Sequence, residues 1–335
     1  MHEPDPLSRI DGAVAARADL IGGEDPTAFR LFNGHLEGDG RYVIDAYGAT
    51  VVIYHHGEPL AEGDEAFSAL VARLHERLPS VRTVILKERK STLHDRRRGR
   101  VVSADRAEPV VGDVVREHGV RYAVDLLMRQ DAGFYLDTRH LRRWLQDHGA
   151  GASVLNTFAY TGSLGVAARA GGASVLHTDR DARVLAVAKA SYALNGFPVD
   201  RRDFRARDFW SFVRDMKGRA ERFDVVVLDP PFFSSTTGGR VDLNRQTTQL
   251  VNKVRPLVQS GGRLVLVHNS LFVSGAELMR ELDALCTGGW LRVDATIDAP
   301  EDVAGFASTR VRASVTDPAP FNHSTKIVVL EVRHR

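Results

Sequence analysis

The sequence predicts an α/β protein in which a small α+β domain precedes a doubly wound, mostly parallel sheet. From residue 152 onward, short apolar runs alternate with segments whose apolar residues recur at helical spacing. Continuous apolar runs of this kind are typical of parallel strands that helices cover on both faces. Before residue 129 the runs are rich in β-branched and aromatic residues and are joined by short turns, which favours a mixed α+β domain.

Length and composition are consistent with two domains. At roughly 150 residues per domain, 335 residues suffice for two. We expect an N-terminal extension over 1–29, a small α+β domain for substrate interaction over 30–128, and the doubly wound domain over 129–335. The hydrophobic share of 43% and the charged share of 26% are ordinary for a globular protein and exclude a disordered chain. No apolar stretch is long enough to cross a membrane and the first residues lack a secretory signal, so we expect a cytoplasmic protein.

The small domain is expected to contain a hairpin, a helix and further strands. The β-rich runs 42–45 and 50–54 flank a short turn and predict the hairpin. Residues 83–86 and 120–127 have strand character, and the Ala-rich first two dozen residues predict a short helix with a loose end. A longer helix is predicted where apolar residues recur three and four apart, at Phe67, Leu70, Val71, Leu74 and Leu78.

The second domain is expected to alternate strands and helices. Strands are predicted over 154–156, 174–177, 223–228, 263–267 and 327–332. Helices are predicted over 141–145, 163–169, 184–194, 250–258 and 278–285. Asn195-Gly196 is a natural C-terminal helix end, and Gly261-Gly262 is expected to turn the chain into the next strand. Ligands of such sheets bind at the carboxyl ends of the strands, near the point where the strand order reverses.

Cysteine content and net charge exclude several classes of protein. Cys286 is the only cysteine, so the chain has no internal disulfide and no cysteine-based metal cluster. The histidines show no metal-ligand spacing, and we expect no metal. The 45 basic and 43 acidic residues leave a net charge of +2, which neither supports nor excludes nucleic acid, because binding surfaces are local.

Polar residues follow the first strands of the second domain. The loop 156–165 opens a helix but lacks the spaced glycines of the dinucleotide fingerprint; its Gly162 would still let a ligand approach the backbone, and the alternative is an ordinary polar turn. Asp179 ends the next strand and could accept hydrogen bonds from two ribose hydroxyls. Asp208 could accept from an adenine amino group, with Phe209 packing on the ring. For both aspartates the alternative is a helix cap.

The motif Asp229-Pro230-Pro231-Phe232 follows a buried strand and is the more specific signal. Two prolines fix the backbone and remove two N–H donors. The Asp229 side chain and the adjacent carbonyls can then point at a planar, amine-bearing ring, on which Phe232 could stack. The alternative is a rigid turn at the strand end.

Together these motifs resemble class I S-adenosylmethionine-dependent methyltransferases, which have a Rossmann-like fold. Three segments resemble more closely the bacterial 23S ribosomal RNA methyltransferases that modify cytosine C5 or guanine N7; they are residues 133–139 (GFYLDTR), 156–162 (NTFAYTG) and 229–233 (DPPFF). Residues 30–34, 37–40 and 45–48 resemble the small central domain of that family. Such proteins often begin with a PUA RNA-binding domain. Fewer than 30 residues precede the central domain here, so we expect that module to be absent.

The resemblance implies S-adenosylmethionine as cofactor and assigns residues to it. Asn156, Phe158, Thr161 and Gly162 would surround the methionine part of the cofactor, whereas Asp179 would hold the ribose. The full set of expected cofactor-binding residues is Gln130, Arg139, Asn156, Phe158, Thr161, Gly162, Asp179, Asp208, Phe209 and Asp229. The family pattern has Lys-Thr where this chain has Asp131-Ala132, and Lys, Arg, Ser or Thr where it has Phe232. These departures concern the substrate more than the cofactor.

The position of the only thiol bears on which atom is methylated. Cytosine C5 is a poor nucleophile, and enzymes that methylate it attack C6 with a thiolate. By the resemblance, that cysteine would stand where this chain has Asn269, whereas Cys286 lies in a predicted helix and is expected to be core. A base nitrogen, such as guanine N7, needs only positioning against the methyl donor. The expected catalytic residues are Asp229, Pro230, Pro231, Phe232 and Asn269. A lone histidine at a strand end, such as His268, is more often structural than a catalytic base.

A basic cluster predicts contact with RNA. Arg-rich loops bind phosphates through charge and bidentate geometry. The residues expected to contact RNA are Arg89, Lys90, Arg96, Arg97, Arg98 and Arg100. The alternative is a solvated loop in an Arg-rich sequence.

The leading hypothesis is therefore an RNA methyltransferase, acting on large-subunit ribosomal RNA at a base nitrogen rather than cytosine C5. Three alternatives remain open: a small-molecule methyltransferase with the same cofactor site, a cytosine-C5 ribosomal RNA methyltransferase, and an RNA-binding protein without activity. We expect RNA as partner and no membrane, with a monomer or a homodimer equally open.

Overall fold

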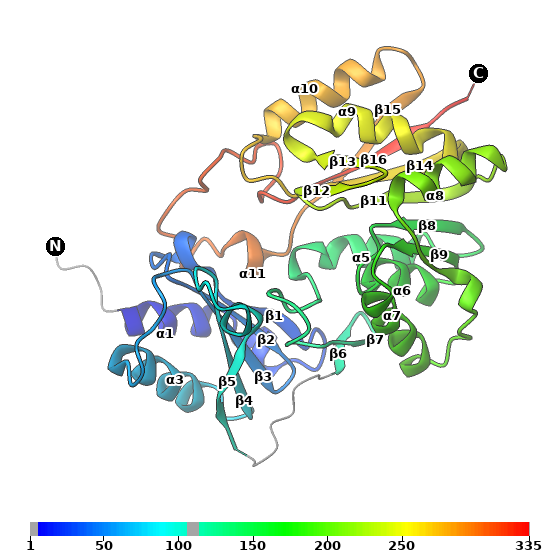
Figure 1. Ribbon diagram of the computed structural model, residues 1–335. Coiled ribbons are helices and arrows are strands. Elements are labelled where there is room, and N and C mark those ends of the chain that lie inside the picture. Colours follow the sequence, from blue (N-terminus) through cyan, green and yellow to red (C-terminus); the bar gives the residue numbers. More distant parts are fainter. Residues whose placement is uncertain (1–5, 106–113, 335) are drawn as a thin grey trace. The chain divides into compact units, whose positions relative to one another are not determined.

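The computed structural model describes residues 6–105 and 114–334, and the chain forms two compact units (Figure 1). Unit 1 comprises Met1–Leu136 and Pro300–Ala313, and unit 2 comprises Asp137–Ala299 and Ser314–Arg335. The sequence places the boundary at 129 rather than 137, and it does not separate residues 300–313 from the second domain. The hydrogen bonds of that segment, described below, explain its place in unit 1.

Unit 1 is built on a five-stranded sheet with the order β1-β2-β3-β4-β5. Its strands are β1 (Ala28–Phe32), β2 (Tyr42–Tyr47), β3 (Thr50–His55), β4 (Thr83–Glu88) and β5 (Arg100–Ala104). The predicted hairpin is confirmed as β2 and β3, and β4 pairs parallel with β3. The strand expected over 120–127 is shorter, because only β7 (Val120–Ala123) pairs, with β6 (Val114–Glu117).

The helices of unit 1 cover this sheet. They are α1 (Pro6–Ala16), α2 (Ala18–Gly22), α3 (Glu65–Arg77), α4 (His94–Arg98) and α11 (Glu301–Ala304), with a 3-10 turn at Gly34–Glu37. Ile10 and Val14 of α1 share a hydrophobic core with Leu70 and Leu74 of α3. Because Ile10, Ala13 and Val14 are spaced three and four apart, they form one buried stripe. Helix α1 is therefore a core element of unit 1, whereas the sequence predicts only a short helix with a loose end in this region.

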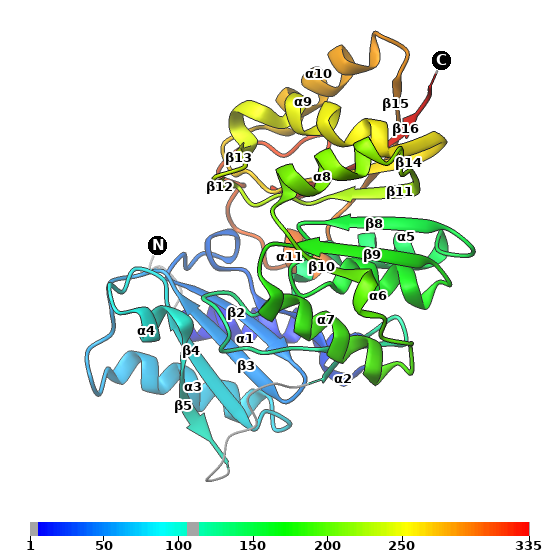
Figure 2. The same cartoon turned by 45° about the vertical axis from the view of Figure 1, so that its right-hand side comes forward.

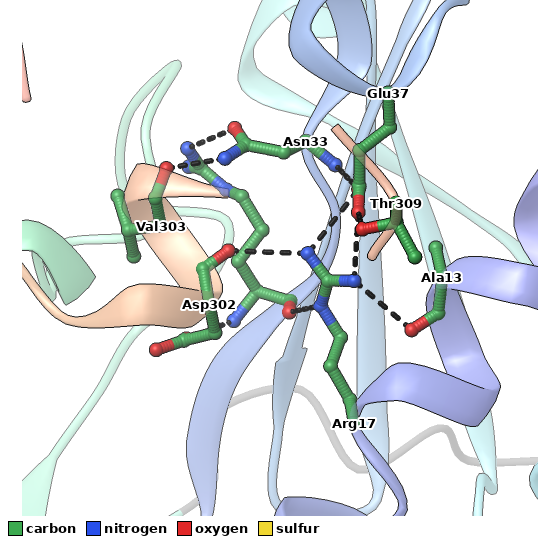
Figure 3. A network of polar contacts seen from close by, with 8 residues as sticks. Ala13, Arg17, Asn33, Glu37, Asp302, Val303 and Thr309 are labelled. Atoms are coloured by element: carbon green, nitrogen blue, oxygen red, sulfur yellow. Dashed lines mark hydrogen bonds and ion pairs between the residues drawn. The ribbon is translucent and has the colours of Figure 1, made fainter. Parts of the chain in front are cut away.

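A buried ion pair attaches residues 300–313 to unit 1 (Figure 3). The Arg17 guanidinium, 1% exposed, donates to Glu37 Oε1 at 2.9 Å and to the Asp302 carbonyl at 3.2 Å. Glu37 also accepts from the Asn33 backbone at 2.6 Å and from the Thr309 hydroxyl. Since Asp302 and Thr309 belong to the returning segment, these hydrogen bonds fix it to Arg17, which follows α1, and to Glu37 in the 3-10 turn after β1.

Unit 2 contains a seven-stranded sheet with the order β10-β9-β8-β11-β14-β16-β15. Its strands are β8 (Ser153–Thr157), β9 (Ser174–Asp179), β10 (Phe204–Ala206), β11 (Phe223–Leu228), β14 (Val258–His268), β15 (Leu291–Ile297) and β16 (Lys326–Val332). The strands from β10 to β14 are parallel, whereas β16 runs antiparallel to β14 and β15. The doubly wound sheet that the sequence predicts is confirmed. Its order reverses between β8 and β11, which is where such sheets bind ligands.

Helices cover both faces of this sheet (Figure 2). They are α5 (Arg139–Asp147), α6 (Ser163–Ala170) and α7 (Ala182–Leu194) on one face, and α8 (Phe209–Gly218), α9 (Leu243–Val254) and α10 (Gly275–Cys286) on the other. Alternate residues of β11 follow this division: Val225 and Val227 pack with α5 and α6, whereas Val226 and Leu228 pack with α8, α9 and α10.

Two details of unit 2 differ from the sequence-based expectation. The helix expected to reach residue 258 ends at Val254 and is followed by a 3-10 turn at Arg255–Leu257. Gly261-Gly262 then lies inside β14 and not before it. The pairing of β11 with β14 shifts register here, so the two glycines bend the strand at an irregularity.

Candidate cofactor and substrate site

The loop that follows β8 has an unusual backbone. Phe158 and Tyr160 have φ angles of 52° and 51°, and Gly162 has a φ of 79°. Positive φ in residues other than glycine is strained and is concentrated at functional sites. A Cβ at Gly162 would lie 2.5 Å from the Cβ of Ala188 on α7, so the glycine is required by packing as well as by its φ. The loop is thus held close to α7 in a conformation that its sequence does not favour.

Asn156 lies at the end of β8 with one polar atom unused. The side chain is 1% exposed, and its Nδ2 lies 3.5 Å from His177 Nδ1. Burial lowers the pKa of His177 to about 3, so this ring is neutral and can accept from the amide. The Asn156 Oδ1 is buried and has no hydrogen-bond partner among the described residues. A buried acceptor of this kind is costly unless a ligand donates to it.

Asp179 connects the end of β9 to the strained loop. Its Oδ2 accepts from the Tyr160 backbone at 3.0 Å, and its Oδ1 accepts from the Asp181 backbone at 3.0 Å. A carboxylate oxygen has two lone pairs, so both oxygens can still accept from a hydroxyl. Asp181, and not Asp179, caps α7. The helix-cap alternative for Asp179 is therefore not what the structure shows, and a contact with ribose stays a prediction.

Asp208 does cap a helix. Its Oδ1 accepts from the Trp210 and Ser211 backbones at the start of α8, and its Oδ2 accepts from the Thr236 hydroxyl at 2.7 Å. Phe209 is buried and stacks on Phe158, with ring centroids 4.4 Å apart. This stacking joins the loop after β8 to the start of α8. Contacts of Asp208 and Phe209 with an adenine ring stay predictions.

Asp229 follows β11 and lies near a second carboxylate. Burial, and then the charge of Asp137, raise the pKa of Asp229 to about 7. Asp137 lies in the 3-10 turn Leu136–Thr138 and accepts from the Thr325 hydroxyl at 2.6 Å. Pro230 is buried, Pro231 is exposed and Phe232 is 39% exposed. The sequence did not single out Asp137, although it stands in the segment 133–139 on which the resemblance depends.

At the end of β14, His268 is buried in the protein interior and Asn269 is only half-buried. His268 is fully buried, with Nε2 3.2 Å from the Leu243 carbonyl, and burial, followed by the charge of Lys326, lowers its pKa to about 4. The ring is thus neutral and internal, in agreement with a structural role. Asn269 is half-buried, and its Oδ1 has no partner in the part of the chain that is described. Asp229 and Asn269 follow neighbouring parallel strands.

Three other expected cofactor residues lie in three different segments. Arg139 is buried at the start of α5, and Thr161 is buried in the strained loop. Gln130 belongs to unit 1, where its carbonyl accepts from Arg89 at 2.6 Å. Contacts of these three with the cofactor stay predictions.

The basic cluster of unit 1 is partly neutralised by its own surroundings. The Glu88 carboxylate is buried, with the residue 1% exposed. Its Oε1 lies 3.4 Å from Arg96 Nη1, and its Oε2 lies 3.9 Å from Arg100 Nε. Arg98 donates to the Leu127 carbonyl. Lys90 is 58% exposed and lies 3.3 Å from the exposed Glu58. Some cations that the sequence assigns to RNA therefore also hold the fold together, and the RNA contact of all six, Arg97 included, stays a prediction.

Two further kinds of feature are absent from the residues that the structure describes. Within residues 6–105 and 114–334, no cluster of three or more His, Cys, Asp or Glu residues is arranged to hold a metal ion. Over the same residues, no helix combines the length and the apolar character that a membrane crossing needs.

Comparisons with known proteins place these features in a family. The sequence profile described as "S-adenosylmethionine-dependent methyltransferase" matches residues 50–302. The "Putative ribosomal RNA large subunit methyltransferase YwbD" of Bacillus subtilis is 31% identical over 273 residues, which cover 79% of this chain and 66% of that protein. The "Ribosomal RNA large subunit methyltransferase I" of Shewanella denitrificans is 29% identical over 307 residues, 88% of this chain and 71% of that protein. The chain thus spans about two thirds of the length of these relatives.

A comparison of structures gives the same fold. The crystal structure of "SMU.776, a putative methyltransferase complexed with SAH" superposes with a TM-score of 0.82 and 20% sequence identity, over 97% of this chain and 80% of that one. The expected class I methyltransferase fold is confirmed, and so is the expected cofactor of the family, S-adenosylmethionine. Because the profile spans well over half of the chain, the chain belongs to the family of S-adenosylmethionine-dependent methyltransferases.

Proposed function

We propose that this protein methylates large-subunit ribosomal RNA at a base nitrogen, and not at cytosine C5. The location of the only thiol is the observation that favours a nitrogen over cytosine C5 as the methylated atom. Cys286 ends α10, is half-buried and packs against the hydrophobic core. Burial raises the pKa of its thiol, so the thiolate is disfavoured. Asn269, and not a cysteine, follows β14 beside Asp229.

The residues at the carboxyl ends of β8 and β9 fit the cofactor. S-adenosylmethionine supplies a methyl group on a sulfonium. The unpartnered Oδ1 of Asn156 can accept from the ammonium of its methionine part, and the Asp179 carboxylate can accept from its ribose hydroxyls. The strained loop 158–162 is anchored to Asp179 through the Tyr160 backbone.

Asp229 and Asn269 have the chemistry to hold a base edge. With a pKa of about 7, the Asp229 carboxyl is present in both forms near neutral pH. It can therefore donate to a ring acceptor when protonated or accept from an amino group when ionised. The Asn269 Oδ1 adds a further acceptor. A nitrogen with its own lone pair then needs only orientation toward the methyl group, which is worth several orders of magnitude in rate.

RNA as the substrate is supported by the names of the relatives and by the cations of unit 1. Both relatives described above are named as large-subunit ribosomal RNA methyltransferases. Lys90 and Arg100 are exposed on the segment 89–100 that the sequence assigns to phosphate contacts.

The test is transfer of tritiated methyl from S-adenosylmethionine to in vitro transcribed large-subunit ribosomal RNA, followed by mass analysis of the nucleosides. We expect a methylated base nitrogen, and we expect Cys286→Ala to retain the activity. Methylcytosine carrying the label on C5, or loss of activity in Cys286→Ala with an unchanged circular dichroism spectrum, would overturn the choice of atom. Absence of label in any RNA, with methylation of a small molecule instead, would overturn the choice of substrate.

A further inference from the structure

The loops after β11 and β14 carry four large apolar side chains that are exposed in unit 2. Phe272 is 72% exposed, Leu271 54%, Phe233 52% and Phe232 39%. The rings of Phe232 and Phe272 meet with centroids 5.8 Å apart and planes tilted by 51°. We call Phe232 and Phe272, with the adjacent Leu271 and Phe233, the aromatic ledge. Solvent exposure of so many large apolar groups is unfavourable unless a partner covers them.

The backbone under the aromatic ledge is fixed by hydrogen bonds. The Phe232 carbonyl accepts from the Leu243 backbone at 3.1 Å, and the Phe272 backbone donates to the Ser270 hydroxyl at 3.1 Å. The Leu271 carbonyl accepts from Thr316 at 2.5 Å. Ser270 is itself fully buried. The rings therefore project from backbone that hydrogen bonds hold in place, so a ligand that stacks on them has only their side-chain torsions to order.

The position and charge of the ledge favour nucleic acid. Its two loops follow β11 and β14, which are neighbours in the sheet, and they directly follow the proposed base-edge residues Asp229 and Asn269. The segment 232–245 forms the hairpin of β12 (Phe233–Thr236) and β13 (Gly239–Asp242) and the start of α9, and its charged residues are Arg240, Asp242 and Arg245. Arg240 lies over the Phe233 ring at 4.9 Å and pairs with Asp242 at 2.9 Å, which leaves the Arg245 charge in excess. Aromatic rings beside a cationic group are the usual platform for unpaired bases.

We propose that Phe272, paired with Phe232, stacks on an unpaired RNA base that flanks the methylated nucleotide. This inference rests on the proposed function, because it assumes that RNA is the substrate. Phe272 thereby selects targets whose neighbouring base is unstacked, such as those in loops or opened helices. A flanking base held on the ledge would keep the target base extruded toward Asp229, as enzymes that act on a base within RNA require.

The test compares four variants in methyl transfer to large-subunit ribosomal RNA. Because a stacked base is worth about 1–3 kcal/mol, Phe272→Ala should raise the KM for RNA by roughly 5- to 150-fold. Phe272→Tyr, which keeps an aromatic face, should stay near the parent, whereas Phe272→Leu should behave like Phe272→Ala. Val315→Ala removes another exposed apolar side chain, 81% exposed, and should leave the KM unchanged. None of the four should change the Kd for S-adenosylhomocysteine.

The outcomes separate this inference from the proposed function. If the parent methylates RNA and Phe272→Ala leaves its KM unchanged, the ledge proposal is overturned while the proposed function stands. Equal KM values for Phe272→Leu and the parent would also overturn it, since stacking would not be involved. If Phe272→Ala changes the sedimentation coefficient of the protein and not the KM for RNA, the ledge is a protein interface. If the parent labels no RNA, the proposed function fails first.

Discussion

In unit 1 the buried guanidinium of Arg17 donates to Glu37, Ala13 and Asp302, whereas in unit 2 the buried Oδ1 of Asn156 has no partner among the described residues. Both side chains are 1% exposed. The difference lies in what each region is folded to bind. Polar groups that hold a fold together are paired within it, and groups that await a ligand are left with unused acceptors. Five predictions test or extend this comparison.

The largest effect is expected from Glu37→Ala in unit 1. It leaves the buried Arg17 charge uncompensated, which typically costs about 3–5 kcal/mol. Trp144, Trp210 and Trp290 are the three tryptophans and all lie in unit 2, so tryptophan emission reports unit 2 during urea unfolding, while circular dichroism reports the whole chain. We expect the urea concentration at the unfolding midpoint, as measured by circular dichroism, to fall.

A double variant serves as the control for this pair. Arg17→Leu with Glu37→Leu removes both charges and should be more stable than Glu37→Ala, because no buried charge is left alone. If Glu37→Ala proves as stable as the parent, the pair is not what fixes residues 300–313 to unit 1.

Asn156→Leu should have the opposite profile. It removes an acceptor without a partner, keeps the volume of the side chain and loses only the long 3.5 Å contact between Nδ2 and His177 Nδ1, so the free energy of unfolding should change by less than about 1 kcal/mol. A hydrogen bond to a charged group is worth about 1.5–3 kcal/mol, so the Kd for S-adenosylhomocysteine should rise by roughly 10- to 100-fold in calorimetry.

Asn322 provides a matched control in the same unit. Its Oδ1 and Nδ2 bond to the Ala299 backbone at 2.9 and 2.8 Å. Asn322→Leu should therefore destabilise the protein by about 2 kcal/mol and leave the Kd for S-adenosylhomocysteine unchanged. The comparison breaks down if both variants affect stability and binding alike.

The rate of methyl transfer should depend on pH through Asp229, whose pKa Asp137 influences. Asp137→Asn removes a like charge, so the pKa of Asp229 should fall from about 7 and the matching limb of the pH–rate profile should move to lower pH. Thr325→Val removes the hydrogen bond to Asp137 but keeps the charge, and it should not shift the limb to lower pH. An unshifted limb in Asp137→Asn would exclude Asp229 as the group that titrates.

Stability should follow the same group. The folded protein keeps a proton on Asp229 up to about pH 7, whereas the unfolded chain releases it near its ordinary value of 3.8. The folded state therefore binds more protons between these values, and the contribution of Asp229 to stability is lost as pH rises through this window. Asp229→Asn should flatten that part of the curve of unfolding free energy against pH.

The sequence is enough to predict the sheet and its strand ends. It is not enough to predict which residues pair when they are far apart along the chain. The residues Asn156, Asp179 and Asp229 all lie at carboxyl ends of parallel strands, because apolar runs locate such strands reliably. The return of residues 300–313 to unit 1 depends on Asp302 and Thr309 meeting Arg17 and Glu37 across more than 260 positions, which no local pattern reveals. Phe272 was missed because a single aromatic in a short loop has no periodicity to mark it.

The smallest effect is expected at Lys90. The contrast between paired and unpaired polar groups extends here to two lysines of one segment, Lys87 and Lys90. Lys87 is fully buried and donates to the carbonyls of Arg98 and Arg129, whereas Lys90 is 58% exposed beside an exposed glutamate. Lys90→Gln should lower the slope of log affinity for RNA against log salt by about 1 and leave stability unchanged. Lys87→Gln should instead lower the urea midpoint, since its carbonyl partners would lose a buried donor. If Lys90→Gln alters stability and leaves the salt dependence alone, even the exposed cations of this segment belong to the fold, and the RNA surface must lie elsewhere.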